Sequence, residues 1–317
     1  MAPRAPARST GVRVDGVRDG KERGLGSGAT VWSDTRQTCC PIGSLLRSMT
    51  NSHHEQALHF RSLHCPGQPL VLPNAWDAAS ARLIEEAGAA AIATSSAGVA
   101  WSVGAGDGER MGRDRALDLI ARVASMVSVP VTADIEGGYA EDPDGVAETI
   151  RRVLDAGAVG VNLEDGPRPA AEHVERIADA RKAAGSALFI NARIDTYLLS
   201  LGDPATRLGD TLYRAAAYIA AGADGIFVPG VADAETIAAL AAELTVPLNV
   251  MAGPGSPSIS ELAGLGVTRV SLGPAIALAA YAAARRAARE LLTAGTYQAL
   301  DGSLGFAETD ALMAAPA

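Results

Sequence analysis

From residue 69 onward, short apolar runs alternate with longer stretches in which apolar residues recur every three or four positions. Short apolar runs predict buried strands, and the longer period predicts amphipathic helices. The expected strands are residues 69–73, 90–95, 130–136, 160–165, 188–195, 225–229, 248–252 and 269–272. The expected helices are residues 76–87, 113–126, 143–156, 171–184, 211–221, 234–244, 258–264 and 276–292. This alternation predicts an α/β fold of the (β/α)8 TIM barrel type, with a doubly wound parallel sheet as the alternative.

The two ends of the chain lack this alternation. Residues 1–48 are rich in Gly, Ser and Arg, and we expect a disordered or mis-assigned extension, with Met49 as an alternative start. Acidic residues within the extension disfavour a transit peptide. We expect residues 49–68 to be a lead-in segment, residues 69–295 to form the barrel, and residues 296–317 to form a tail.

Composition narrows the function further. The chain has 317 residues, of which 48% are hydrophobic, enough for a substantial core. A net charge of -9 argues against partners such as nucleic acid and anionic membranes. The cysteines, Cys39, Cys40 and Cys65, all precede the regular pattern, so we expect no disulfide framework and a cytoplasmic location.

Lysine and histidine are scarce in the barrel region. Lys182 lies at a predicted helix end, which disfavours Schiff-base chemistry because a barrel lysine of that kind would lie on a strand. His173 is the one histidine beyond the first expected strand, and a surface position is its more ordinary interpretation. A histidine-rich zinc site and a Ser-His-Asp triad are therefore disfavoured.

Polar residues gather at the carboxyl ends of the expected strands, where barrel enzymes carry their active sites. They are Asn74, Asp77, Ser95, Ser96, Asp134, Glu136, Glu164, Asp165, Asn191, Arg193, Asp195, Asn249 and Ser271.

Three of these residues are carboxylates at the ends of consecutive strands. Strand alternation predicts that Asp134 and Glu136 face the same way, and Glu164 ends the next strand. Carboxylates that meet at one point repel each other unless a cation lies between them, and oxygen ligands suit Mg²⁺ or Mn²⁺. We therefore favour a metal site over ordinary surface carboxylates, with Asp165 as a supporting or capping residue.

Three other features leave alternatives open. Arg193 needs a partner because an unpaired buried charge is costly. It can pair with Asp195 or Glu164, bind a substrate carboxylate or phosphoryl group, or do both. Residues 94–98 can form an anion-binding nest or an ordinary turn, and the Gly-rich residues 104–109 can form a lid or a linker.

Taken in order, these residues resemble the isocitrate lyase / phosphoenolpyruvate mutase superfamily, from about Pro69 to Gly273. Asp134-Ile-Glu stands where the family has an Asp-x-Asp metal motif, and Asn162-Leu-Glu-Asp is similar to its metal-associated Glu-Asp. Asn191-Ala-Arg-Ile-Asp is similar to its Ala-Arg-x-Asp motif.

The resemblance implies Mg²⁺ (or Mn²⁺) near Asp134, Glu136 and Glu164, held partly through water, and a small-molecule carboxylate substrate of the 2-oxo or 2-hydroxy type. The implied substrate-binding residues are Trp76, Ser95, Ser96, Ala97, Asp107, Arg193 and Asn249. Family members are typically tetramers that exchange the last barrel helix, so we expect a homo-oligomer, a tetramer or a dimer, with residues 276–292 exchanged between subunits.

The chain departs from the family pattern in two places. Glu136 replaces an aspartate, which lengthens the side chain by one methylene. Family lyases that cleave isocitrate or methylisocitrate carry a Lys-Lys/Arg-Cys-Gly-His loop after the fourth strand, with a catalytic cysteine. Here residues 164–169 lead almost directly into the next helix, and residues 69–295 contain no cysteine. Isocitrate and methylisocitrate cleavage are therefore disfavoured.

The sequence predicts a Mg²⁺-dependent lyase that forms or cleaves a carbon–carbon bond of a small 2-oxo or 2-hydroxy carboxylate through an enolate. Arg193, Glu164 and Tyr139 are the expected catalytic residues, and Arg168 and His173 are further candidates for proton transfer. One alternative is chemistry at a phosphorus–carbon bond, as in phosphoenolpyruvate mutase or phosphonopyruvate hydrolase. Another is a catalytically silent barrel that binds a 2-oxo acid.

Overall fold

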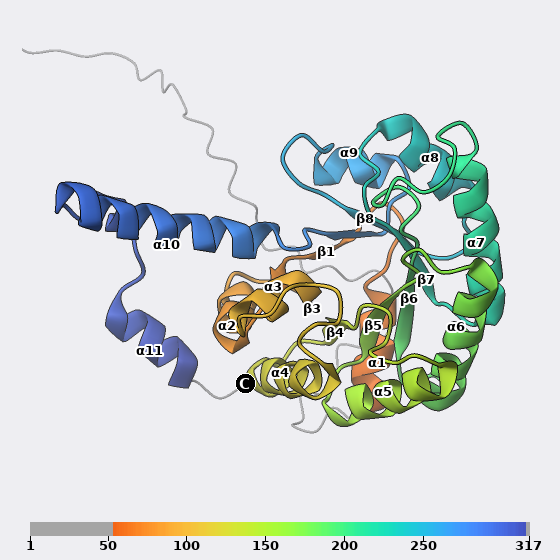
Figure 1. Ribbon diagram of the computed structural model, residues 1–317, viewed down its shortest axis with the longest axis horizontal. Helices are drawn as coiled ribbons and strands as arrows, with labels where there is room; N and C mark the ends of the chain where they lie inside the picture. The colour runs from red at the N-terminus through yellow and green to blue at the C-terminus, as the bar shows by residue number, and fades with distance from the viewer. Residues whose placement is uncertain (1–52, 315–317) are drawn as a thin grey trace, which may run out of the picture. The chain divides into compact units, whose positions relative to one another are not determined.

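The computed structural model describes residues 53–314, and it confirms the expected barrel (Figure 1). Nine parallel strands form one sheet in the order β1-β9-β8-β7-β6-β5-β4-β3-β2. The strands are β1 (Leu70–Leu72), β2 (Asn74–Ala75), β3 (Ile92–Thr94), β4 (Val131–Asp134), β5 (Gly160–Glu164), β6 (Phe189–Arg193), β7 (Gly225–Val228), β8 (Leu248–Met251) and β9 (Arg269–Ser271). The extension, residues 1–48, lies outside the described residues.

The barrel closes through its first expected strand. Pro73 splits that strand into β1 and β2, because proline has no N–H group to donate to a neighbouring strand. The first half, β1, pairs with β9, and the second half, β2, pairs with β3. The nine observed strands therefore correspond to the eight expected ones.

Helices surround the strands, as Figure 1 shows. They are α1 (His53–Ser62), α2 (Ala78–Glu86), α3 (Ser96–Ser102), α4 (Arg113–Met126), α5 (Pro143–Asp155), α6 (Ala170–Ala184), α7 (Arg207–Ala221), α8 (Ala234–Glu243), α9 (Ile259–Gly264), α10 (Ala275–Ala294) and α11 (Phe306–Ala314), with a 3-10 turn η1 (Gln298–Leu300). Side chains of Asp77, Asp142, Asp233 and Ser258 cap the N-termini of four of them. The sequence pattern did not predict α1 or α3.

Strand register brings the polar residues of neighbouring strands to the same height. Asp134 pairs with Asn162, Asn162 pairs with Asn191, and Glu164 pairs with Arg193. Residues that are paired in a parallel sheet point to the same side, so these side chains share the barrel interior. The site is therefore built on strands, whose positions are more rigid than those of loops.

Helix α1 covers the amino-terminal end of the barrel interior. Phe60 is fully buried there, in an apolar cluster with Leu72 and Phe189. His64 follows the helix, and its ring stacks on Phe189 with 4.4 Å between ring centroids. The lead-in segment thus contributes part of the core.

The carboxyl-terminal helices differ from the barrel in burial. Helix α10 buries only Ala277, although Leu278, Tyr281 and Leu292 are large and apolar. Phe306 of α11 is 86% exposed. Within residues 53–314, no helix is both long and apolar enough to cross a membrane. The exchange of α10 between subunits stays a prediction.

Candidate active site

A cavity of about 200 Å³ lies among the carboxyl ends of the strands. Its wall contains Asn74, Ser95, Ser96, Ala97, Asp107, Asp134, Asn162, Arg193, Leu198, Phe227, Pro229, Met251, Ser271, Gly273 and Pro274. The cavity brings together six of the residues predicted to bind metal or substrate: Ser95, Ser96, Ala97, Asp107, Asp134 and Arg193. The wall therefore combines carboxylates and an arginine with apolar side chains.

Asp134 is the carboxylate at the end of β4 that faces this cavity. Its Oδ1 accepts a hydrogen bond of 3.1 Å from the backbone N–H of Glu136. Burial raises the pKa of Asp134 above its usual range, while the Arg193 guanidinium and hydrogen bonds from Glu136 and Asn162 act to lower it. Asp107 lies close enough for its charge to raise this pKa as well.

Glu136 is held by the loop that carries Asp107. Its Oε1 accepts a hydrogen bond of 2.8 Å from the Tyr139 hydroxyl, and its Oε2 accepts one from the backbone N–H of Glu109. The Glu109 carboxylate in turn accepts from the backbone N–H of Tyr139 at 2.7 Å. Glu109, Glu136 and Tyr139 all have positive φ angles, between 52° and 62°, a strained conformation for residues other than Gly. The Gly-rich loop is therefore tied to the site.

The charge of Asp134 lies close enough to Glu136 and Glu164 to raise the pKa values of both carboxylates. Among residues 53–314, no three His, Cys, Asp or Glu side chains are placed to hold a metal ion together. Strand β4 ends at Asp134, so strand alternation does not determine the direction of Glu136. A metal ion shared by the three carboxylates stays a prediction.

Glu164, Arg193 and Asp195 form a charged group beside Asp134 and Glu136. We call these five residues the acidic rim. The Arg193 guanidinium lies 2.7 Å from Glu164, 2.7 Å from Asp195 and 3.9 Å from Asp134. These contacts confirm the ion pairs expected for this arginine. Burial, together with the neighbouring carboxylates, raises the pKa of Glu164 to about 8, against the lowering effect of Arg193.

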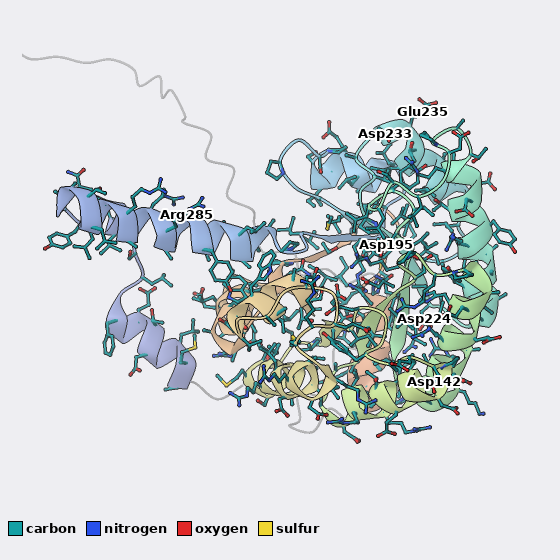
Figure 2. The ribbon with its side chains drawn as sticks, viewed as in Figure 1. Asp142, Asp195, Asp224, Asp233, Glu235 and Arg285 are labelled. Carbon is teal, nitrogen blue, oxygen red and sulfur yellow. The ribbon has the colours of Figure 1, made fainter. Side chains whose placement is uncertain are left out.

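Asp195 differs from the surface acids in its position. In Figure 2 it lies near the strands, whereas Asp233 and Glu235 lie at helix α8.

Asp165 supports the rim from outside the cavity. Its carboxylate accepts hydrogen bonds from the Asp195 backbone N–H and from the Tyr218 hydroxyl, at 2.9 and 2.8 Å, and it is fully buried. This fits the supporting role expected for Asp165.

The short helix α3 begins at the cavity wall. Ser95 caps it by accepting from the backbone N–H of Gly98. The N–H groups of Ser96 and Ala97 lie in the first turn, where N–H groups have no intrahelical partner. Residues 94–98 therefore lead from the end of β3 into the start of α3, and anion binding by this segment stays a prediction.

Beneath the acidic rim lies a second polar group, which we call the amide layer: Asn162, Asn191, Asn249 and Arg269. Their side chains are buried and connected by hydrogen bonds, with Asn191 Nδ2 donating to Asn162 Oδ1 at 2.8 Å and to Asn249 Oδ1 at 3.1 Å. Asn249, a predicted substrate-binding residue, lies in this layer and is not in the cavity wall. Sequence reasoning missed Asn162 and Arg269, although a polar residue in the middle of a buried strand was a usable signal.

Six other predicted residues are not part of the cavity wall: Glu136, Glu164 and Tyr139, described above, and Trp76, Arg168 and His173. Trp76 packs toward Tyr281 of α10, with 6.5 Å between ring centroids. Arg168 contacts the backbone at Gly137 and lies 3.6 Å from Glu172. His173 is fully buried against Tyr218, so the surface position expected for it is wrong. It lies on the face of α6 that packs against the barrel. The sequence did not indicate this burial, because the residues next to His173 are polar.

The oxygen donors present suit a hydrated magnesium ion. Mg²⁺ usually keeps several waters and binds one or two carboxylates together with its ligand. Asp134 faces the cavity with a carboxylate oxygen whose nearest cationic partner is 3.9 Å away, and Asp107 lines the same wall. These two residues fit such an ion, with Glu136 and Glu164 acting through water or through their charge.

Comparison with known proteins agrees with this architecture. Residues 60–292 match the family model for phosphoenolpyruvate phosphomutase. An uncharacterized Mycobacterium tuberculosis protein is 38% identical over 73% of this chain and 88% of its own length. Oxaloacetate decarboxylase 2 of Pseudomonas fluorescens is 28% identical over 75% of this chain and 85% of its own length. A solved Burkholderia cenocepacia protein, described provisionally as a phosphonomutase, is 45% identical with a TM-score of 0.72, over 74% of this chain and 99% of its own.

Proposed function

The chain belongs to the phosphoenolpyruvate phosphomutase family, within the isocitrate lyase / phosphoenolpyruvate mutase superfamily, and we propose that it is a Mg²⁺-dependent carbon–carbon lyase. Its substrate is a small 2-oxo or 2-hydroxy carboxylate. One observation carries this proposal: the cavity joins two carboxylates and an arginine to an apolar wall in about 200 Å³. That volume takes roughly seven water-sized groups, at about 30 Å³ each.

Asp134 and Asp107 would hold the metal ion, and the charge of Glu136 and Glu164 would add to its attraction. When bound, Mg²⁺ supplies a Lewis acid that stabilises the negative charge of an enolate fragment. The buried position of Asp134 strengthens this electrostatic effect because little water is present to screen it.

Two groups orient the substrate carboxylate. The backbone N–H groups of Ser96 and Ala97, at the start of α3 in the cavity wall, would bind one oxygen of that carboxylate. Arg193 uses Nε for Asp195 and Nη1 for Glu164, which leaves the Nη2 hydrogens for an oxygen of the substrate. Arg193 thus has both of the roles considered for it, as ion-pair partner and as substrate ligand.

The apolar wall favours carbon–carbon over phosphorus–carbon chemistry. Leu198, Phe227 and Met251 face the cavity, and Arg193 is the one cation in the described cavity wall. Three carboxylates already surround that cation, so it offers little net charge to a doubly charged phosphonate. An uncharged alkyl fragment fits such a wall because it loses no hydration there.

Tyr139 and Glu136 are the proposed proton carriers. Burial raises the pKa of Tyr139 well above its usual range, so its Oη keeps the proton and donates to Glu136 Oε1. Burial also raises the pKa of Glu136 to about 7, where a carboxyl group exchanges protons readily at neutral pH. The buried His173 packs against Tyr218. We therefore favour Tyr139 and Glu136 over His173 as the groups that transfer the proton.

Proton NMR in D₂O tests the proposal. We would follow pyruvate and 2-oxobutyrate with Mg²⁺ and the wild type, the Asp134→Ala variant, or a Glu148→Ala control whose site is exposed on α5. Enzyme-dependent deuterium exchange at C3, absent in Asp134→Ala and kept in the control, is the expected result. Turnover of phosphonopyruvate without such exchange would favour the phosphorus–carbon alternative. Ligand binding without exchange or turnover would favour the silent barrel.

We also propose a homo-oligomer, a tetramer or a dimer, that covers helix α10. The exposed apolar residues Leu278, Leu291 and Leu292 of this helix support it. Light scattering after gel filtration should show more than one chain, and a monomeric mass would contradict this part of the proposal.

A further inference from the structure

The side chain of Asn162 links the amide layer to the acidic rim. Asn162 is 5% exposed, lies on β5 beside Asp134 of β4, and lines the cavity. Its Oδ1 accepts two hydrogen bonds, one of 2.8 Å from Asn191 Nδ2 and one of 3.2 Å from Arg269 Nη2. Its amide also lies close enough to the Asp134 carboxylate to act to lower the pKa of that group.

Arg269 determines which way this amide points. A guanidinium group carries donors only, so the atom of Asn162 that faces it must be the oxygen. The NH₂ group of Asn162 must then face Asp134 and the cavity. This assignment follows from the donor and acceptor chemistry of the two side chains.

The burial of Arg269 in the barrel interior costs free energy, because its guanidinium is charged. It is 1% exposed, and its Nε and Nη1 have no hydrogen-bond partner among the residues that the structure describes. Within residues 53–314, no carboxylate forms an ion pair with this guanidinium, and the Asp134 charge acts on it only at longer range. Its Cζ lies 5.8 Å from the centre of the Phe60 ring. An apolar side chain of similar size would avoid the cost of burying this charge.

We propose that Arg269 is a positioning residue, which holds the Asn162 amide so that its NH₂ donates to Asp134 and toward the ligand in the cavity. The inference rests on the proposed function, because Asp134 is the metal ligand proposed there. Outer residues that orient a metal ligand typically change metal affinity 10- to 100-fold when they are replaced.

Mn²⁺ binding without substrate, followed by electron paramagnetic resonance, tests this role. We expect Arg269→Met to weaken Mn²⁺ binding about 10- to 100-fold and to leave the unfolding temperature equal or higher, because it removes a buried charge. Arg269→Lys keeps a donor for Asn162 Oδ1 and should recover most of the affinity. Thr132→Val is the matched control, since Thr132 is 1% exposed in the same interior and its Oγ1 has no partner among the described residues.

A double-mutant cycle separates this role from a general effect on the core. If Arg269 acts through Asn162, combining Arg269→Met with Asn162→Leu should weaken binding no more than the larger single effect. Unchanged Mn²⁺ affinity in Arg269→Met, or effects that multiply in the double variant, would overturn the inference while the proposed function stands. Absence of Mn²⁺ binding in the wild type would overturn both.

If Arg269→Met does not fold, a wild-type measurement decides. The side-chain NH₂ resonances of Asn162 should shift when Mg²⁺ is added, whereas those of Asn249 should not, because that amide donates to Val250 O and Ser271 Oγ. Unshifted Asn162 resonances in a protein that binds Mg²⁺ would overturn the inference.

Discussion

The acidic rim and the amide layer lie in the same barrel interior, and each contains a buried arginine. The two arginines differ in the groups that surround them. Arg193 of the rim contacts Glu164, Asp195 and Asp134. Arg269 of the layer has one amide oxygen and one aromatic ring. Neighbouring carboxylates raise the pKa of Arg193 above its usual range despite its burial, whereas burial lowers that of Arg269 to about 9. The charge of Arg193 is in contact with carboxylates, whereas the charge of Arg269 is in contact with dipoles and interacts with Asp134 only at longer range.

The largest effect should come from breaking the charge balance of the rim. Arg193→Met leaves Glu164 and Asp195 without their cation, and removing one partner of a buried pair costs about 3–5 kcal/mol. Urea unfolding should show this loss, whereas Arg269→Met should show none. A loss below about 1 kcal/mol for Arg193→Met would mean that the two regions do not differ in this way.

Acid should act on the region beneath the layer through His64. Burial first, and then the charge of Arg269, lower the pKa of His64 to about 3. His64 therefore binds a proton near pH 6.5 in the unfolded chain but stays neutral in the folded protein. Its contribution to the free energy of unfolding is complete above pH 6.5 and is lost progressively as the pH falls toward 3. Between pH 7 and 5 this amounts to about 2 kcal/mol.

Urea unfolding of His64→Gln at the two pH values measures that difference. The variant should lose about 2 kcal/mol less than the wild type on acidification. His59→Gln, at an exposed position, is the control and should behave as the wild type. Equal losses in His64→Gln and the wild type would place the acid sensitivity elsewhere.

The rim should respond to pH in the same sense, but through metal binding and not through folding stability. The pKa values of Glu136 and Glu164 are raised to about 7 and about 8 by burial. Below these values the two groups are protonated and neutral, so the attraction for a cation increases as the pH rises. Mn²⁺ affinity should rise about tenfold from pH 6 to 8, and Glu136→Gln should flatten the rise. An affinity independent of pH would contradict these ionisations.

The smallest effect should follow removal of one hydroxyl at the rim. Tyr139→Phe leaves Glu136 Oε1 without its donor, which should reduce the free energy of unfolding by about 1 kcal/mol. Tyr213→Phe is the matched control, since that side chain is 68% exposed. Equal stability of the two variants would show that the tie between Tyr139 and Glu136 contributes nothing measurable.

Local patterns were enough to predict the strands and helices of the barrel. Apolar periodicity placed helix α4 at residues 113–126, as observed, and the capping residues of α2 and α5 follow from local hydrogen bonding. The ion pairs of Arg193 were predictable because a charge on a buried strand must find a partner. In contrast, the direction of Glu136 depends on its positive φ angle and on the backbone N–H of Glu109. Neither of these follows from a repeating pattern in the sequence.

The sequence by itself determined the barrel, the positions of the acids along the strands and the need of Arg193 for counter-charge, because each depends on neighbours in the chain or on a repeating period. Only the tertiary structure decided that α1 covers the barrel interior, that His173 is buried, and that Arg269 meets Asn162 across the barrel. Arg269 and Asn162 are 107 residues apart, and closure of the strands into a ring is what brings them within hydrogen-bonding distance.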